Sequence, residues 1–255
     1  MPNPLRALAR RLVGVRRVPT YYLPWLTRPG LECVLLLNNI AARFKAGYTR
    51  GPFPVVVSQY DAGGRLVRRY EAVLADNTDT AEVRLEPTPA GCGFVTVEGE
   101  RIHSGFYVAL SGGDTYTATH GRGEFIERYP VWARAAAAVL GGALALLGRT
   151  IPAFTRGQYV YAGGDSRSHL LLMTLANVTN RIRVTFEGNG AGPVSRLVAL
   201  PPMGSHLLDV SSQVPVGPGT TVRRVRLQGN AWFNLYVVGA GARDLAGPLS
   251  LMHVK

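Results

Sequence analysis

The chain repeats one pattern of strand-like runs and turns, and this repeat limits its fold more than any other feature. The segments "VVVSQYDAGGRLVRRYEAVL" (55–74) and "IRVTFEGNGAGPVSRLVAL" (182–200) each place two strand-like runs around a glycine-rich turn. The segments "VEGERIHSGFYVALSGG" (97–113) and "LQGNAWFNLYVVGAG" (227–241) each place an aromatic run after a glycine turn. Because a recurring pattern indicates a recurring structural unit, we predict two copies of one domain, each about 90–100 residues long.

Individual residues extend the match between the two copies. Tyr107 corresponds to Tyr236, and each copy ends in a short run that carries a histidine, His120 in the first and His253 in the second. We interpret the two histidines as a shared structural position rather than as catalytic groups. In each copy a further segment lies between the two repeated blocks. This segment is "TAEVRLEP" (80–87) in the first copy and "SHLLDVSSQVP" (205–215) in the second.

The repeated runs predict an all-β fold, because they are rich in β-branched and aromatic residues and are broken by Gly, Pro or Asp. A spacing near ten residues indicates β-sandwiches. The arrangement resembles immunoglobulin-like sandwiches in general, and its strand–turn–strand pattern is similar to that of the sensory rhodopsin transducer family, although no motif is specific to either. We therefore expect two tandem immunoglobulin-like β-sandwich domains from an internal duplication, residues 29–122 and 158–255. The expected strands are 32–38, 53–59, 65–73, 80–86, 93–98, 105–110, 115–120, 158–162, 169–178, 181–187, 195–200, 205–210, 221–228, 231–238 and 248–254.

Residues 1–28 are expected to form a basic amphipathic arm outside the sandwich. They hold six arginines and no acidic residue, and their leucines recur at helical spacing opposite several of the arginines. Tyr21, Tyr22 and Trp25 follow. A basic amphipathic helix followed by Tyr and Trp is typical of a membrane interface. Packing on the chain's own sandwich, a soluble partner and nucleic acid remain as alternatives.

Residues 123–157 are expected to form a linker that contains an apolar helix, "ARAAAAVLGGALALLGR" (133–149). The uncharged stretch between its arginines is too short to cross a bilayer, which needs about 20 apolar residues. A helix that is apolar around its whole circumference should be buried. Three burials remain open, namely between the two sandwiches, in a partner, or in a membrane interface.

The segment "GRGEFIERYP" (121–130) has no counterpart in the second copy. It is expected to be a joint between the first sandwich and the apolar helix, with Glu124 and Arg128 facing each other if a helix begins there. Its charged residues are expected to form local ion pairs or partner contacts.

The sequence contains no motif that announces a reaction. Nucleophile-elbow, phosphate-loop and zinc-protease motifs are absent, and the histidines form no HxH or HxxxH pair. Cys33 and Cys92 show no metal-ligand spacing, and whether they pair stays open. No cofactor or metal is expected, and no secretory signal peptide is recognised, which favours a cytoplasmic setting.

These features predict a non-enzymatic accessory or scaffold subunit, peripheral to the cytoplasmic side of a membrane. Its partners would be the membrane surface or a membrane protein complex and other protein subunits. Despite the net charge of +12, nucleic acid is not expected, because reading and stacking side chains are not apparent. The alternative is a carbohydrate-type binding module that uses Tyr60, Trp232 and Tyr236. The expected docking residues are Arg6, Arg10, Arg11, Arg16, Arg17, Tyr21, Tyr22, Trp25, Arg122, Arg128 and Trp132.

Overall fold

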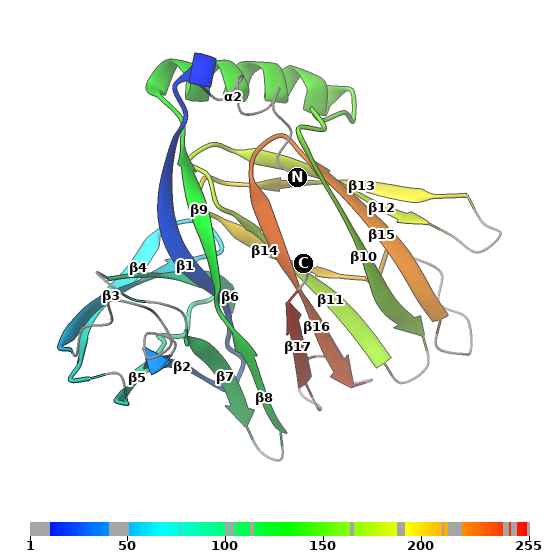
Figure 1. Ribbon diagram of the computed structural model, residues 1–255. Coiled ribbons are helices and arrows are strands. Elements are labelled where there is room, and N and C mark those ends of the chain that lie inside the picture. Colours follow the sequence, from blue (N-terminus) through cyan, green and yellow to red (C-terminus); the bar gives the residue numbers. More distant parts are fainter. Residues whose placement is uncertain are drawn as a thin grey trace.

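The structure is a computed structural model, and within the residues it describes the chain is mostly β-strand (Figure 1). The all-β prediction is confirmed, and every expected strand overlaps an observed one. The described residues are 11–40, 51–76, 78–99, 102, 105–112, 115–163, 166–187, 192–210, 212–213, 221–241, 245 and 249–253.

The first unit is a sandwich of two sheets, with strand orders β4-β3-β6-β1-β9 and β5-β2-β7-β8. Runs of Val, Leu and aromatic residues form its strands, as expected from their β propensity. The strands are β1 Arg16–Leu26, β2 Glu32–Asn38, β3 Phe53–Asp61, β4 Leu66–Leu74, β5 Thr80–Arg84, β6 Cys92–Glu98, β7 Tyr107–Gly112, β8 Thr115–His120 and β9 Arg122–Arg128.

Helix α2 (Val131–Leu146) leads from β9 into the second unit, which has strand orders β13-β12-β15-β10 and β14-β11-β16-β17. The two sets are continuous because β10 also pairs with β11 beside the turn that joins them. The strands are β10 Phe154–Gly163, β11 Ser166–Thr174, β12 Asn180–Glu187, β13 Val194–Leu200, β14 Ser205–Asp209, β15 Thr221–Gly229, β16 Phe233–Gly241 and β17 Leu249–His253.

The same strand order occurs in both units. Strands β1 to β8 take the places of β10 to β17, so that β4-β3-β6-β1 matches β13-β12-β15-β10 and β5-β2-β7-β8 matches β14-β11-β16-β17. The register follows the residues that the sequence pairs, since Tyr107 lies opposite His120 and Tyr236 lies opposite His253. Strand β9 is the addition that the first unit carries beside β1.

The two units share a hydrophobic core. Leu171 and Met173 of β11 pack in the same cluster as the core of the first unit, whereas Leu170 and Leu172 face the core of the second. Strand β11 is therefore buried on both faces, as are much of β1, β6 and β16. A sheet of the first unit thus packs face to face against a sheet of the second.

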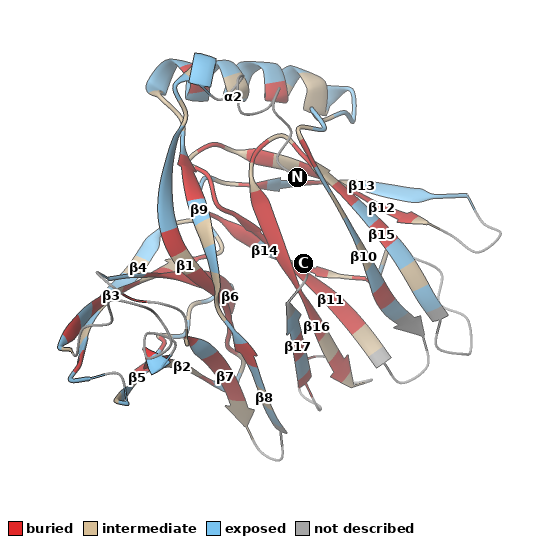
Figure 2. Ribbon diagram, in the orientation of Figure 1, coloured by how far each residue is buried: buried red, intermediate tan, exposed pale blue. Residues whose placement is uncertain are grey.

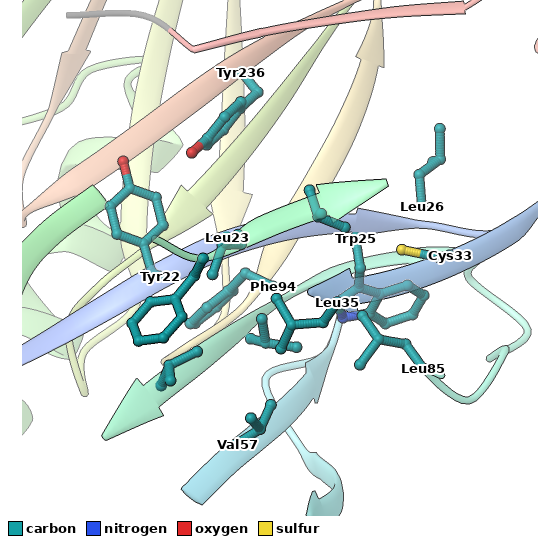
Figure 3. Packing of buried hydrophobic residues seen from close by; sticks show 14 of the residues in the cluster. Tyr22, Leu23, Trp25, Leu26, Cys33, Leu35, Val57, Leu85, Phe94 and Tyr236 are labelled. Carbon is teal, nitrogen blue, oxygen red and sulfur yellow. The ribbon is translucent and has the colours of Figure 1, made fainter. Parts of the chain in front are cut away.

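Two tyrosines mark the centre of this contact (Figure 3). The rings of Tyr22 on β1 and Tyr236 on β16 meet edge to face, with their centroids 6.2 Å apart. The Tyr236 hydroxyl also donates to the backbone oxygen of His120, at 3.3 Å. Strand β9 adds backbone contacts, because the Glu127 amide donates to the Leu175 oxygen at 2.9 Å.

The prediction of a separate arm over residues 1–28 is wrong for residues 16–26. These form β1, which lies between β6 and β9 and whose residues from Thr20 onward are buried or half-buried. Trp25 is completely buried, and its indole Nε1 donates to the Tyr60 oxygen at 2.9 Å. Aromatic residues that suggest a membrane interface here fill a sheet that is covered on both faces. Residues 1–10 lie outside the described residues.

This position of β1 predicts two different outcomes for N-terminal truncation. A chain that lacks residues 1–10 should keep β1 and unfold cooperatively near the temperature of the full chain. A chain that lacks residues 1–27 should not fold, because truncation of a core Trp such as Trp25 alone costs about 3–5 kcal/mol. Circular dichroism during heating measures both, and a cooperative transition in the shorter chain would contradict the assignment of β1.

Candidate docking surface

Helix α2 lies across one end of the molecule, next to both units (Figure 1). It begins after Pro130, whose extended backbone serves as the N-cap, and it ends before Gly148, which adopts a φ of 62°. Strand β12 holds its C-terminal end, because the Thr150 hydroxyl donates to the Arg181 oxygen at 2.6 Å and the Arg183 guanidinium donates to the Gly148 oxygen. Both ends of α2 are therefore tied to the body.

The face of α2 that turns inward carries mainly small residues. Ala133 and Gly141 are its buried residues, and Ala137 between them is half-buried. Their spacing of four places them on one side of the helix. Gly141 lies so close to the body that a Cβ atom there would come within 2.7 Å of Nη1 of Arg181. The absence of a side chain at this position thus permits a close approach.

Most large apolar residues of α2 are exposed instead, and much of the helix is coloured as exposed in Figure 2; only Leu144 is half-buried. Trp132 is 60% exposed and Leu146 is 90% exposed. A surface helix normally places its large apolar residues toward the core and its polar residues toward water, so α2 reverses the usual arrangement. A contiguous apolar patch of this kind marks an interaction site. Its large exposed residues, with Leu147 just beyond the helix, are Val131, Trp132, Val139, Leu140, Leu146 and Leu147.

Arginines lie at both ends of this apolar face. Arg16 and Arg128 are partners on β1 and β9, where the two strands run as a ribbon toward α2. Arg134 lies in the first turn of the helix, and Arg149 follows its last turn; all four side chains are exposed. No acidic residue occurs in the segments 11–31 and 128–163. The surface is therefore both apolar and cationic.

The structure brings together five of the predicted docking residues at this end of the molecule. Arg11, Arg16, Arg17, Arg128 and Trp132 are all exposed there. The Arg17 guanidinium lies 4.2 Å from the centroid of the Phe125 ring, on the neighbouring strand. Exposed Leu12 adds an apolar side chain just before β1.

The other predicted docking residues lie elsewhere. Tyr22 and Trp25 belong to the core and cannot contact a surface, and half-buried Tyr21 packs edge-on against Phe106 at 5.2 Å. Arg122 is directed to a carboxylate of its own strand, with 3.5 Å between its Nε and Oε1 of Glu124. Arg6 and Arg10 lie outside the described residues.

The expected joint over residues 121–130 is largely a strand. Residues 122–128 form β9, which pairs with β1 through seven residues. Glu124 and Arg128 therefore do not face each other on a helix, and the ion pair forms between Arg122 and Glu124 instead. Residues 122–128 form a strand rather than the start of a helix because they pair with β1, which lies about a hundred residues earlier in the chain.

The apolar helix is present as predicted, but it is not buried between the two units, which was one of the three expected burials. The units meet through β1, β6, β11 and β16, and this contact leaves no space for a helix. The outward residues Val139, Leu140 and Leu146 are missing from the predicted set. The sequence signal for them is the uncharged run between Arg134 and Arg149, which does not indicate which side faces outward.

Possible metal ligands do not gather in the described part of the chain. No cluster of three His, Cys, Asp or Glu side chains occurs there that could hold a metal. Cys33 and Cys92 are both buried and unpaired with each other, and burial raises the pKa of the Cys33 thiol to about 12. Among the described residues, no helix is both long and apolar enough to cross a bilayer.

The aromatic residues named for carbohydrate binding do not form an exposed platform. Tyr236 is completely buried, and half-buried Tyr60 stacks on Phe94 with a centroid distance of 5.4 Å. Half-buried Trp232 packs edge-on against Phe154 at 5.2 Å. These residues serve packing within the two units.

Comparisons with known proteins give no family assignment. No protein-family model matches the chain, and no curated protein matches it. Among solved structures, the chain is similar to the one described as "Crystal Structure of Thermotoga maritima 1070", with 18% identity and a TM-score of 0.32. The match covers 38% of this chain and 90% of that chain. A similarity at this level supports no conclusion about function.

The outward direction of the α2 side chains predicts how the chain responds to substitution. Leu140→Gln should change the free energy of unfolding by less than about 0.5 kcal/mol, because the side chain is exposed in both states. Leu171→Ala, at a completely buried position of β11, should cost about 2–5 kcal/mol. Urea denaturation of the two variants measures the difference. Equal losses of stability would mean that the outward face of α2 is covered in the isolated protein.

Proposed function

We propose that this protein is a non-enzymatic accessory or scaffold subunit that docks on a membrane or membrane protein complex. The docking surface is the outward face of α2 together with its flanking arginines. The observation that carries this proposal is the reversed helix, whose small residues Ala133 and Gly141 face the body while Trp132 and Leu146 face outward. The cytoplasmic, peripheral location expected from the sequence remains part of the proposal.

Energetics favour a docked state for this helix. Full burial of one large apolar side chain is worth about 1.5–3 kcal/mol, and α2 offers several of them on one face. The inward face has little room for large side chains at Gly141, because the helix lies close to the Arg181 side chain there. A partner that covers the outward face gains this burial without rearranging the sandwiches.

The rigid body behind α2 supports a scaffold role. Because α2 starts at β9 of the first unit and is held by β12 of the second, a partner bound to α2 is fixed relative to both units. The shared core prevents the units from moving independently. Among the described residues of the segment 1–28, the proposed docking role is kept for Arg11, Leu12, Arg16 and Arg17. These residues flank α2.

We also infer that the two units arose by internal duplication. The repeated strand order and the matched pairs Tyr107–His120 and Tyr236–His253 support this inference. The immunoglobulin-like part of the fold prediction is kept only for the two-sheet architecture. Immunoglobulin constant domains use the strand orders ABED and CFG, whereas each unit here places its first strand beside its sixth.

Membrane fractionation of cells that express the full chain tests the proposed function. The double variant Leu140→Gln with Leu146→Gln should move the protein from the membrane fraction to the soluble fraction, with at least about a tenfold change in partition. A matched control is Leu66→Gln with Val73→Gln, since these side chains of β4 are also exposed. Equal partition of the two double variants, or a wild-type protein that is entirely soluble and monomeric, would refute the proposal.

A further inference from the structure

We propose that the outward face of α2 binds directly to an anionic lipid bilayer, with the helix lying in the plane of the membrane interface. This inference rests on the proposed function and names its partner. Val139, Leu140 and Leu146 would enter the boundary of the acyl chains. The surrounding arginines would contact the phosphates of the lipid headgroups.

Charge complementarity identifies an anionic surface as the occupant. The exposed arginines at this end of the molecule come from three elements and lie at both ends of the apolar face, and the adjoining segments contain no acidic residue. Glu127, the nearest carboxylate before α2, is completely buried and accepts a hydrogen bond from the Tyr129 hydroxyl at 2.9 Å. An apolar face flanked by arginines matches the layered chemistry of a bilayer, whose acyl chains lie beneath negatively charged headgroups.

The attachment of α2 sets its orientation. Its 16 residues span about 24 Å at the usual helical rise, less than the hydrocarbon core of about 30 Å. Pro130 connects it to β9, and the bond from Thr150 to the Arg181 oxygen fixes its other end. The helix therefore cannot turn upright into a membrane without breaking these contacts. Trp132, exposed near one end of the helix, lies where interfacial Trp residues are favoured.

Two other occupants fit the surface less well. A second copy of this chain would place Arg134 and Arg149 of one copy near the same arginines of the other, and like charges repel. A transmembrane helix of a protein partner commonly packs through small residues. On α2 those residues, Ala133 and Gly141, already face the body.

The test uses the full chain and two kinds of vesicle, phosphatidylcholine alone and phosphatidylcholine with phosphatidylglycerol in equal parts. Sedimentation should show at least about tenfold tighter binding to the anionic vesicles, and this preference should weaken as salt screens the charges. The emission of Trp132 should shift to shorter wavelength on binding. Trp25 is buried and Trp232 is half-buried, so Trp132→Phe should remove most of this shift while binding largely persists.

Variants separate the electrostatic and apolar contributions. Arg134→Gln and Arg149→Gln should each weaken binding to anionic vesicles about fivefold. Leu140→Gln with Leu146→Gln should weaken it by more than about tenfold, whereas the control Leu66→Gln with Val73→Gln should not change it. Sedimentation with vesicles without any shift in Trp132 emission would show adsorption only and would overturn insertion of α2.

Remaining outcomes distinguish failure of this inference from failure of the proposed function. A protein that stays in the membrane fraction of cells but ignores both vesicles binds a membrane protein, so the lipid inference fails and the docking function survives. A dimer that is broken by Leu140→Gln with Leu146→Gln, without vesicle binding, identifies a second copy as the occupant and also overturns the lipid inference. A protein that is soluble in cells and ignores vesicles refutes both.

Discussion

Burial of one sheet from each unit on both faces is the constraint on which the rest of this structure depends. Strands β1 and β6 have the core of the first unit on one side and the second unit on the other, and β11 and β16 are enclosed in the same way. The contact between Tyr22 and Tyr236 lies where these sheets meet. Removing either sheet would expose apolar residues of both units, so the two sandwiches form one body.

This stacking also determines where α2 can lie. The units already cover each other's apolar sheet faces, so the helix between them in sequence is left at one end of the stack. There it rests on Ala133 and Gly141, with the Arg181 side chain beneath Gly141. A helix that had to complete the core would turn large residues inward. Helix α2 turns mainly small residues inward and leaves most of its large ones exposed.

The fold was predictable from sequence wherever local signals and the repeat agreed. Strand–turn–strand patterns place β3 with β4 and β12 with β13, and the match of Tyr107 with Tyr236 holds in the register. Strand β1 was not predictable in this way, because a strand covered on both faces shows no alternation of apolar and polar residues. Strand β9 forms by pairing with β1, which is distant in sequence. Because β1 was not predicted, β9 was not predicted either.

The candidate site, like the fold, was predictable from the sequence only in part. Charge and aromatic content select Arg16, Arg128 and Trp132, which are exposed beside or on α2. They also select Tyr22 and Trp25, which are buried, since aromatic residues suit a sandwich core as well as a membrane interface. The apolar pattern of a segment predicts that the segment is covered, but it does not identify the surface that covers it. Residue size adds information once the fold is known. Strand β1 places its largest side chains against the chain's own sheets, whereas the buried residues of α2 are Ala133 and Gly141, and Leu144 is its only half-buried large residue. Within the described part of the chain, the outward face of α2 is left exposed.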